Sequence, residues 1–179
     1  VCDGTPSPND MVCIMANGKA GNYKISREDT EFSKFTFALR KTLMEICRRL
    51  VLDCDKDGHI LTCKVSGALS QQIARAIAKN VVASLNIRRA ILNGVSDVES
   101  ILYAINSVTD VFRYEDMQIA LESEGQAYVL YEENTVIKLG STHLLRLLND
   151  EEITVKITLT DGNYAATAFG CLNAKEIST

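Results

Sequence analysis

Residues 153–159 carry the pattern that most restricts how this chain can fold. Apolar and polar side chains alternate there without a break, and the turn-forming sequence Asp161-Gly162-Asn163 follows shortly afterwards. Residues 164–171 are then small or apolar. Side chains alternate between the two faces of a strand, so this pattern predicts two strands of a sheet with one buried face. The apolar positions of the first strand are Ile153, Val155, Ile157 and Leu159.

Helical spacing dominates the first half of the chain. Over residues 28–52 the apolar residues recur at intervals of three and four, which predicts an amphipathic helix with a buried face. Ser26, followed three residues later by Asp29, forms an approximate N-cap pattern ahead of this helix. Ser70 can cap a second helix over residues 71–85.

The remaining segments predict a mixture of strands and helices. Residues 97–108 have helical spacing, whereas residues 86–94 fit either a strand or a short helix. Residues 59–66 predict a strand. Residues 117–121 and 127–131, separated by a loop that contains glycine, predict a hairpin. Ser141 can cap a helix over residues 142–148.

These elements interleave without a regular β-α-β repeat. We therefore expect an α/β or α+β fold, in which helices cover mixed or antiparallel sheets. Residues 11–16 form an unbroken apolar run between two turn sequences, which predicts a strand buried on both faces. The chain of 179 residues is long enough for one domain, and we expect residues 1–179 to form a single region without a separate boundary.

Composition excludes several classes of partner. The net charge is −4 and the basic residues occur in pairs rather than in a cluster, so no nucleic-acid surface is expected. We expect these pairs, Arg40-Lys41, Arg48-Arg49 and Arg88-Arg89, on the solvent-facing sides of helices. No apolar run reaches the roughly 20 residues that a membrane helix needs.

The cysteine pattern and the first residue bear on metal binding and location. None of the six cysteines forms a Cys-x-x-Cys pair, so zinc is not expected, and no other metal or cofactor is. A chain of this size can build its own core without disulfides, which favours a reducing, cytoplasmic compartment. Because the chain starts with Val1 rather than Met, we expect a processed or truncated product.

An acidic segment matches the first half of a calcium-binding EF-hand loop. Three alternate carboxylates, Asp53, Asp55 and Asp57, precede a glycine, and together they could surround one hard cation. However, Lys64 occupies the position where a bidentate Glu is required, and a strand rather than a helix is predicted to follow. A plain acidic turn is therefore the stronger interpretation.

Histidine and serine give little sign of catalysis. His59 and His143 lack a partner pattern for a dyad or a metal site, so surface or turn positions are expected. Ser7 and Ser70 lack the surroundings of a nucleophile and are better explained as turn and cap residues.

Three segments of the chain resemble the ornithine acetyltransferase (glutamate N-acetyltransferase) family. The first is the opening phrase Asp3-Gly4, Ser7, Asn9-Asp10, Val12 and Ala16-Asn17-Gly18, which matches the family's Asp-Gly-Asp-Thr-Ser-Thr-Asn-Asp-Thr-Val and Ala-Asn-Gly. The others are Val65-x-Gly67-Ala68-x-Ser70 with residues that follow up to Gly94, and residues 165–171, which are close to Ser-Ala-Thr-Ala-Trp-Gly-Cys. Residues 95–101 depart from the family's Asp-Pro-Asn-Trp-Gly-Arg-Ile and keep only Ile101.

The resemblance implies the C-terminal, or β, portion of such an enzyme. The implied fold is a layered sandwich of two packed sheets with outer helices, of the N-terminal-nucleophile type. A Thr freed by self-cleavage accepts the acetyl group of N-acetylornithine and passes it to glutamate in arginine biosynthesis. That Thr and the oxyanion donors of the α chain are not among these residues, so no catalytic residue is assigned to this chain.

The resemblance also implies substrate-binding residues and partners. Asp55 falls on a substrate-binding Glu in the family's Asp-Gly-Glu-Gly-Ala-Thr-Lys, and Asn173 and Thr179 fall on a terminal Asn and Thr that bind the amino-acid end of the substrate. The partners are the α chain of the same precursor, N-acetylornithine and glutamate, with acetyl-coenzyme A as a further acetyl donor. The implied assembly has two α and two β chains or is larger.

Two other classes of function remain open from the sequence. The first is a paralogue that has lost activity and kept a binding or assembly role, because Asp55 is one methylene shorter than Glu and the motif at residues 95–101 is lost. The second is a calcium-binding module built on residues 53–58.

Overall fold

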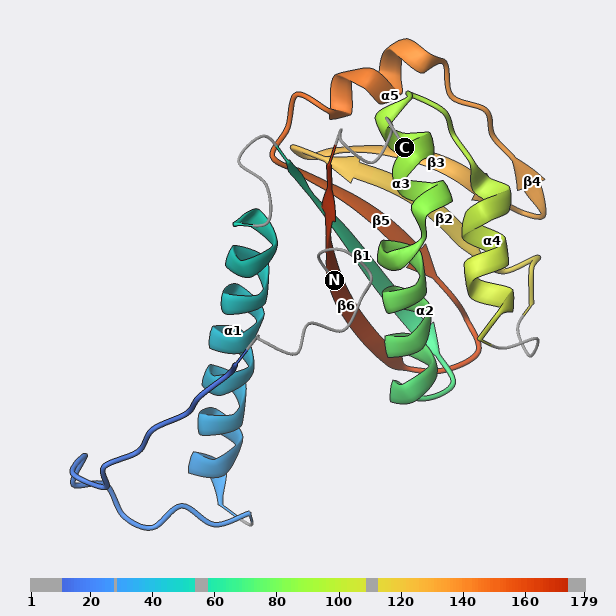
Figure 1. The fold of residues 1–179 in the computed structure, drawn as a ribbon. Coiled ribbons are helices and arrows are strands. Elements are labelled where there is room, and N and C mark those ends of the chain that lie inside the picture. The colour runs from blue at the N-terminus through green and yellow to red at the C-terminus, as the bar shows by residue number, and fades with distance from the viewer. Residues whose placement is uncertain (1–10, 28, 54–57, 109–112, 174–179) are drawn as a thin grey trace.

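The computed structural model describes residues 11–27, 29–53, 58–108 and 113–173. The described residues form one six-stranded sheet in the order β4-β3-β2-β5-β1-β6 (Figure 1). The elements along the chain are α1 (Thr30–Leu52), β1 (His59–Ala68), α2 (Gln71–Ala83), α3 (Leu85–Leu92), α4 (Val98–Asn106), β2 (Gln118–Ser123), β3 (Gln126–Glu132), β4 (Thr135–Val136), α5 (Ser141–Leu147), β5 (Glu152–Thr158) and β6 (Tyr164–Leu172).

Strands β1 and β5 are neighbours in the interior of the sheet and run parallel to each other. Their register places Leu61 opposite Ile153 and Val65 opposite Ile157, so the apolar positions of both strands share one face. β6 pairs with β1 and β2 pairs with β5, both antiparallel. The alternating pattern at residues 153–159 thus predicted a strand correctly, and the mixed α+β class is confirmed.

Helix α2 covers the apolar face of the sheet, and α3 and α4 pack beside it (Figure 1). Ile77 and Val81 of α2 are completely buried in the same cluster as Leu61. Burying one such aliphatic side chain stabilises the fold by about 1.5–3 kcal/mol. The helix begins where the sequence predicted, because the Ser70 hydroxyl oxygen accepts a hydrogen bond of 3.2 Å from the Ile73 amide.

The opposite face of the sheet is polar over its centre. There β1 presents Thr62 and Lys64, and β5 presents Thr154 and Lys156. The resemblance implied two packed sheets, whereas the described residues form a single sheet covered by helices on its apolar face.

The long helix α1 extends away from the sheet (Figure 1). The prediction of a helix is confirmed. The prediction that one face of this helix is buried is wrong within the described chain, because Val51 is the only buried residue of α1 there. Phe35 and Phe37 are 53% and 71% exposed. The helix touches the sheet through its last two turns, where Val51 packs with Ile60 and Cys171. Within the described ranges, no helix combines the length and the apolar character needed to cross a membrane.

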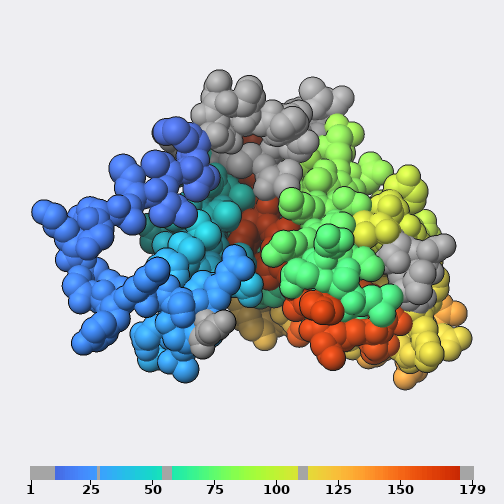
Figure 2. Space-filling view, turned by 90° about the horizontal axis from the view of Figure 1, so that it is seen from below, coloured from blue at the N-terminus to red at the C-terminus, as the bar shows by residue number. Residues whose placement is uncertain are grey.

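Residues 11–16 correct the prediction of a buried strand. They have no strand conformation, and Met11 and Met15 are 86% and 91% exposed. A strand needs hydrogen bonds to a neighbouring strand, and no described strand pairs with this run. Figure 2 shows residues 11–27 and α1 together at one side of the molecule.

Shorter segments are mostly as predicted. The ambiguous residues 86–94 contain the helix α3, which Ser84 caps through a hydrogen bond from the Ile87 amide. The predicted hairpin is β2 and β3. A helix at residues 142–148 is confirmed as α5, but Gly140 is its N-cap and Ser141 makes no capping bond.

Gly67 allows β1 to run close beside the chain that follows β5. Its φ is +75°, and a Cβ atom at this position would lie 1.6 Å from the Leu159 carbonyl oxygen. We expect Gly67→Ala to lower the free energy of unfolding by about 3 kcal/mol or more, because backbone atoms must move. Gly125 has φ +82°, but a Cβ atom there would meet no described atom within 4 Å, so Gly125→Ala should cost only about 1–2 kcal/mol. Urea unfolding measures both, and equal losses would contradict the steric argument.

Asp29 caps α1 in a way that depends on pH. Its carboxylate accepts hydrogen bonds from the amides of Ser26 (2.9 Å) and Phe32 (2.6 Å), which hold the pKa of Asp29 below its usual value. A lowered pKa means that the cap is intact above about pH 4 and is lost as the pH falls through the folded-state pKa. The Phe32 amide shift, followed by NMR, should therefore titrate below pH 3.8. Asp29→Asn should abolish this transition, and a midpoint above 3.8 would refute the assignment.

Candidate functional site

The candidate site lies at the end of the sheet where β1 and β5 begin and β6 ends. Ile60 of β1 lies opposite Glu152 of β5 and opposite Cys171 of β6, so three strands meet there in one row. Asn173 follows directly after β6 and is half-buried. Polar side chains gather around this row and are joined by hydrogen bonds between different elements.

Of the three residues expected to bind substrate, the structure describes one. Asp55 and Thr179 lie outside the described residues. Asn173 is described, and its predecessor Leu172 lies opposite His59, the first residue of β1. Gly58, the first described residue after Asp55, therefore lies at the same end of the sheet as Asn173.

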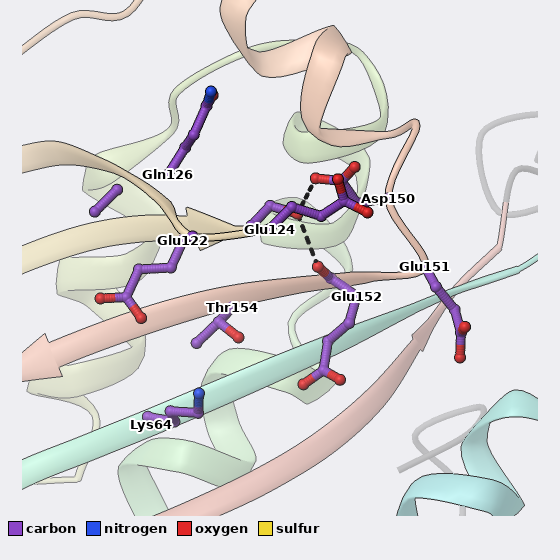
Figure 3. A pocket seen from close by; sticks show the side chains of 11 residues that line it. Lys64, Glu122, Glu124, Gln126, Asp150, Glu151, Glu152 and Thr154 are labelled. Atoms are coloured by element: carbon purple, nitrogen blue, oxygen red, sulfur yellow. Dashed lines mark hydrogen bonds between the residues drawn. The ribbon is translucent and has the colours of Figure 1, made fainter.

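A hollow of about 580 Å³ opens on the polar face beside this row (Figure 3). Its lining comes from the hairpin of β2 and β3, from the start of β5, and from β1. Acidic side chains dominate this lining, and Lys64 is the only cationic residue among the described residues that form it. The labelled lining residues are Lys64, Glu122, Glu124, Gln126, Asp150, Glu151, Glu152 and Thr154.

Glu152 joins three elements at the edge of this hollow. The Thr62 hydroxyl donates to its Oε1 at 2.6 Å, and Arg48 Nε donates to its Oε2 at 3.0 Å. Arg48 Nη2 also donates to Glu151 Oε1 at 3.1 Å. The hydrogen bond to Glu152 raises the pKa of Arg48, against an opposing effect of burial. Both carboxylate oxygens of Glu152 are thus occupied, so this residue ties α1 to the sheet.

Asp150 organises the chain just before β5. The Ser123 hydroxyl donates to the Asp150 carboxylate and lies 3.0 Å from the Glu152 carbonyl oxygen. His59 Nδ1 lies 2.9 Å from the Asp150 carbonyl oxygen. Because a carbonyl only accepts, Nδ1 carries the hydrogen of this bond. The Ser123 hydroxyl is thus fixed between the Asp150 carboxylate and the Glu152 carbonyl oxygen.

Arg88 is a polar residue of this region whose position the sequence pattern predicted wrongly. It was expected on the solvent-facing side of a helix, but it is only 4% exposed. Its guanidinium contacts the carbonyl oxygens of Cys171 and Ala83, at 3.5 and 3.4 Å. Helical spacing from the buried Ile91 could have indicated this position, but residues 86–94 were not assigned to a helix.

The two histidines and the described residues of the calcium-like motif show no sign of a catalytic or metal site. His143 is exposed, as expected, and His59 is half-buried at the start of β1. Of the calcium motif, Asp53 ends α1 as its C-cap, and residues 54–57 lie outside the described chain. Leu61 and Lys64, which would hold the second half of an EF-hand loop, lie in β1. Within the described ranges, no group of three or more His, Cys, Asp and Glu residues could hold a metal ion.

The arrangement can bind and orient a polar ligand. Its described groups are carboxylates, amides and hydroxyls that are fixed by hydrogen bonds, which suits recognition of a substrate with charged ends. Covalent catalysis would need a hydroxyl activated by a base of suitable strength, usually a histidine or an amine, whereas the Ser123 hydroxyl hydrogen-bonds to the Asp150 carboxylate and the Glu152 carbonyl oxygen. The geometry therefore suits the binding of a small polar molecule better than covalent catalysis by the residues of this region.

Comparison with known proteins identifies the family. The model described as the ArgJ family matches residues 1–176, so the chain belongs to the ArgJ family. This confirms the resemblance to ornithine acetyltransferases that the opening phrase and residues 165–171 indicated.

Individual relatives agree with this assignment. The arginine biosynthesis bifunctional protein ArgJ of Staphylococcus saprophyticus is 32% identical over 173 residues, covering 94% of this chain and 40% of that protein. ArgJ 1 of Clostridium acetobutylicum is 25% identical over 169 residues, covering 94% of this chain and 41% of that protein. The chain thus spans about two fifths of the length of these curated relatives.

A solved structure supports the fold. The crystal structure of arginine biosynthesis bifunctional protein argJ from Bacillus halodurans matches with a TM-score of 0.83 and 24% sequence identity. The match covers 98% of this chain and 81% of that chain.

Glu152 offers a direct test of the polar network. Glu152→Gln removes the charge that pairs with Arg48, whose side chain is 30% exposed, and we expect a loss of about 1–2 kcal/mol in the free energy of unfolding. Glu45→Gln is the matched control, because the pair of Glu45 and Arg49 is largely exposed and should contribute less than about 0.5 kcal/mol. Urea unfolding compares the two variants. An equally small effect for both would show that Glu152 does not anchor α1.

Proposed function

We propose that this chain is the β portion of an ornithine acetyltransferase, which moves an acetyl group from N-acetylornithine to glutamate. The observation that carries the proposal is the position of Asn173 beside the start of β1, in a chain of the ArgJ family. His59, the first residue of β1, lies opposite Leu172, the residue before Asn173. The family resemblance assigns Asp55 and Asn173 to substrate binding, and we propose that they act on the same amino-acid substrate.

The proposed role of this chain is to hold the amino acid. The Asn173 side chain supplies two N–H donors and one carbonyl acceptor, which suit the carboxylate and amino groups of an amino acid. The carboxylate of Asp55 suits a substrate ammonium group. The α chain and the Thr freed by self-cleavage supply the oxyanion donors and the nucleophile. The Thr hydroxyl oxygen attacks the acetyl carbonyl carbon, ornithine leaves with a proton on its amine, and the amine of glutamate then takes the acetyl group from the ester.

The exposed apolar surface supports the proposed α-chain partner. Met11, Met15 and Phe37 are more than two thirds exposed, and they belong to the segment and the helix that extend from the body (Figure 2). Apolar patches of this kind mark interaction surfaces. We propose that the α chain covers them in a cytoplasmic assembly of two α and two β chains or more.

The second candidate function is a binding or assembly role in a paralogue that has lost acetyl transfer. Residues 95–101 lack the family motif, and Asp97 is used instead as the N-cap of α4, where its carboxylate accepts a 3.0 Å hydrogen bond from the Ser100 amide. The complete precursor, incubated with N-acetylornithine and glutamate, distinguishes the two candidates by mass spectrometry of acetylglutamate. Self-cleavage without acetyl transfer would favour the drifted paralogue.

Asn173→Ala tests the substrate-binding role in the complete protein. We expect the KM for the amino-acid substrate to rise about 10- to 100-fold, because a hydrogen bond to a charged group is lost. Asn86→Ala, a change of an exposed amide on α3, is the control and should leave the KM unchanged. An unchanged KM for Asn173→Ala would exclude Asn173 from the substrate site.

A further inference from the structure

Strand β6 is an edge of the sheet that the described residues form, and the outward carbonyl groups of an edge strand have no partner strand there. The Ile60 amide donates to the Glu151 carbonyl oxygen on the β5 side of β1, at 2.8 Å. In an antiparallel pair, opposite residues alternate between exchanging hydrogen bonds and facing away. Cys171 lies opposite Ile60, so its carbonyl group faces away from β1 and towards the open edge.

Side chains from the helical layer occupy this edge at two places. Gln71 Nε2 donates to the Ala165 carbonyl oxygen at 2.8 Å, near the start of β6. Arg88 Nη1 donates to the Cys171 carbonyl oxygen at 3.5 Å, at the end of β6. Gln71 is at the exposed end of the strand, whereas the contact of Arg88 with Cys171 is buried.

The contact of Arg88 connects β6 to a second fixed point. Its Nη2 donates to the Ala83 carbonyl oxygen, at 3.4 Å, where α2 ends. One planar guanidinium therefore bridges the junction of α2 and α3 to the last residues of β6. A guanidinium presents its donors in a rigid fork, so the bridge restricts the distance and the angle between the two carbonyl groups.

The end of β6 leads directly to the proposed substrate residue. Leu172 is completely buried and lies opposite His59, and Asn173 follows it. The position of the Asn173 backbone is therefore set by the last pairs of an edge strand, where strands open most easily. A small displacement of a substrate-binding group lowers its effectiveness strongly.

We propose that Arg88 is a positioning residue, which clamps the end of β6 and thereby holds Asn173 in place for the amino-acid substrate. The inference rests on the proposed function for the role of Asn173. Arg88 acts through the backbone of residues 171–173 and needs no contact with the substrate. Burial of a permanent charge at this point, in place of an apolar residue that would pack more easily, is consistent with a positional role.

The first test compares KM and kcat in the complete protein. Arg88→Met keeps the apolar stem and removes the donors, and we expect the KM for the amino-acid substrate to rise about tenfold while kcat changes by less than about twofold. Arg88→Lys keeps the charge but lacks the planar fork of donors. Its KM should therefore lie between the KM of Arg88→Met and that of the unchanged protein. Ile91→Val, a change in the buried core of the same helix, is the control for general destabilisation and should leave the KM unchanged.

A double-mutant cycle then shows whether Arg88 acts through Asn173. In the Asn173→Ala background, Arg88→Met should raise the KM by less than about a further twofold, because the group that it positions is already gone. Independent effects that multiply in the double variant would overturn the proposal. An unchanged KM in Arg88→Met would overturn it as well.

Hydrogen exchange tests the clamp without any assay of activity. The amides of His59 and Leu172 exchange hydrogen bonds with each other in the last pair of β1 and β6, so Arg88→Met should speed their exchange about tenfold, and Ile91→Val should not. If the unchanged complete protein makes no acetylglutamate, the proposed function fails while the exchange measurement still decides the clamp. Unchanged exchange in Arg88→Met would refute the clamp even where acetyl transfer is found.

Discussion

The parallel pairing of β1 and β5 is the interaction on which the rest of the structure depends. It aligns two apolar rows, so that Leu61 and Ile153 lie side by side under α2 and their neighbours follow in register. The same register places the polar residues of both strands together on the other face. One pairing therefore produces the core on one side and the polar floor of the hollow on the other, because side chains alternate along a strand.

The start of this pair is also where the polar groups converge. Glu152 is held by Thr62 from β1 and by Arg48 from α1, and Asp150 is held by Ser123 from β2. Each of these carboxylates is satisfied by donors from other elements, which lowers the cost of placing charge near the sheet. The outcome is a hydrogen-bonded frame at one end of the sheet, the end at which Asn173 follows β6.

Two parts of the chain, α1 and residues 11–16, expose apolar side chains because they lie largely outside the core of the sheet and its helices. α1 is anchored by Val51 and Arg48 in its last two turns, and the rest of the helix presents apolar side chains such as Phe37 to solvent. Residues 11–16 have an apolar sequence but no described strand beside them. Both observations have the same physical cause, since an apolar surface becomes a core only where another surface covers it. They agree with a chain that spans about two fifths of the length of its relatives.

The sequence by itself determined the local elements and the family. Alternation predicted β5, and a run of small and apolar residues after a turn predicted β6. Helical spacing predicted α1, α2 and α4, and Ser70 marked the start of α2, because these signals act between residues close along the chain. The tertiary structure alone decided the order of the strands, the exposure of α1 and of residues 11–16, and the buried position of Arg88. Asn173 was assigned by resemblance, but only the antiparallel register of β1 and β6 places it next to the start of β1. These properties depend on contacts between residues that are far apart in sequence, which local periodicity does not encode.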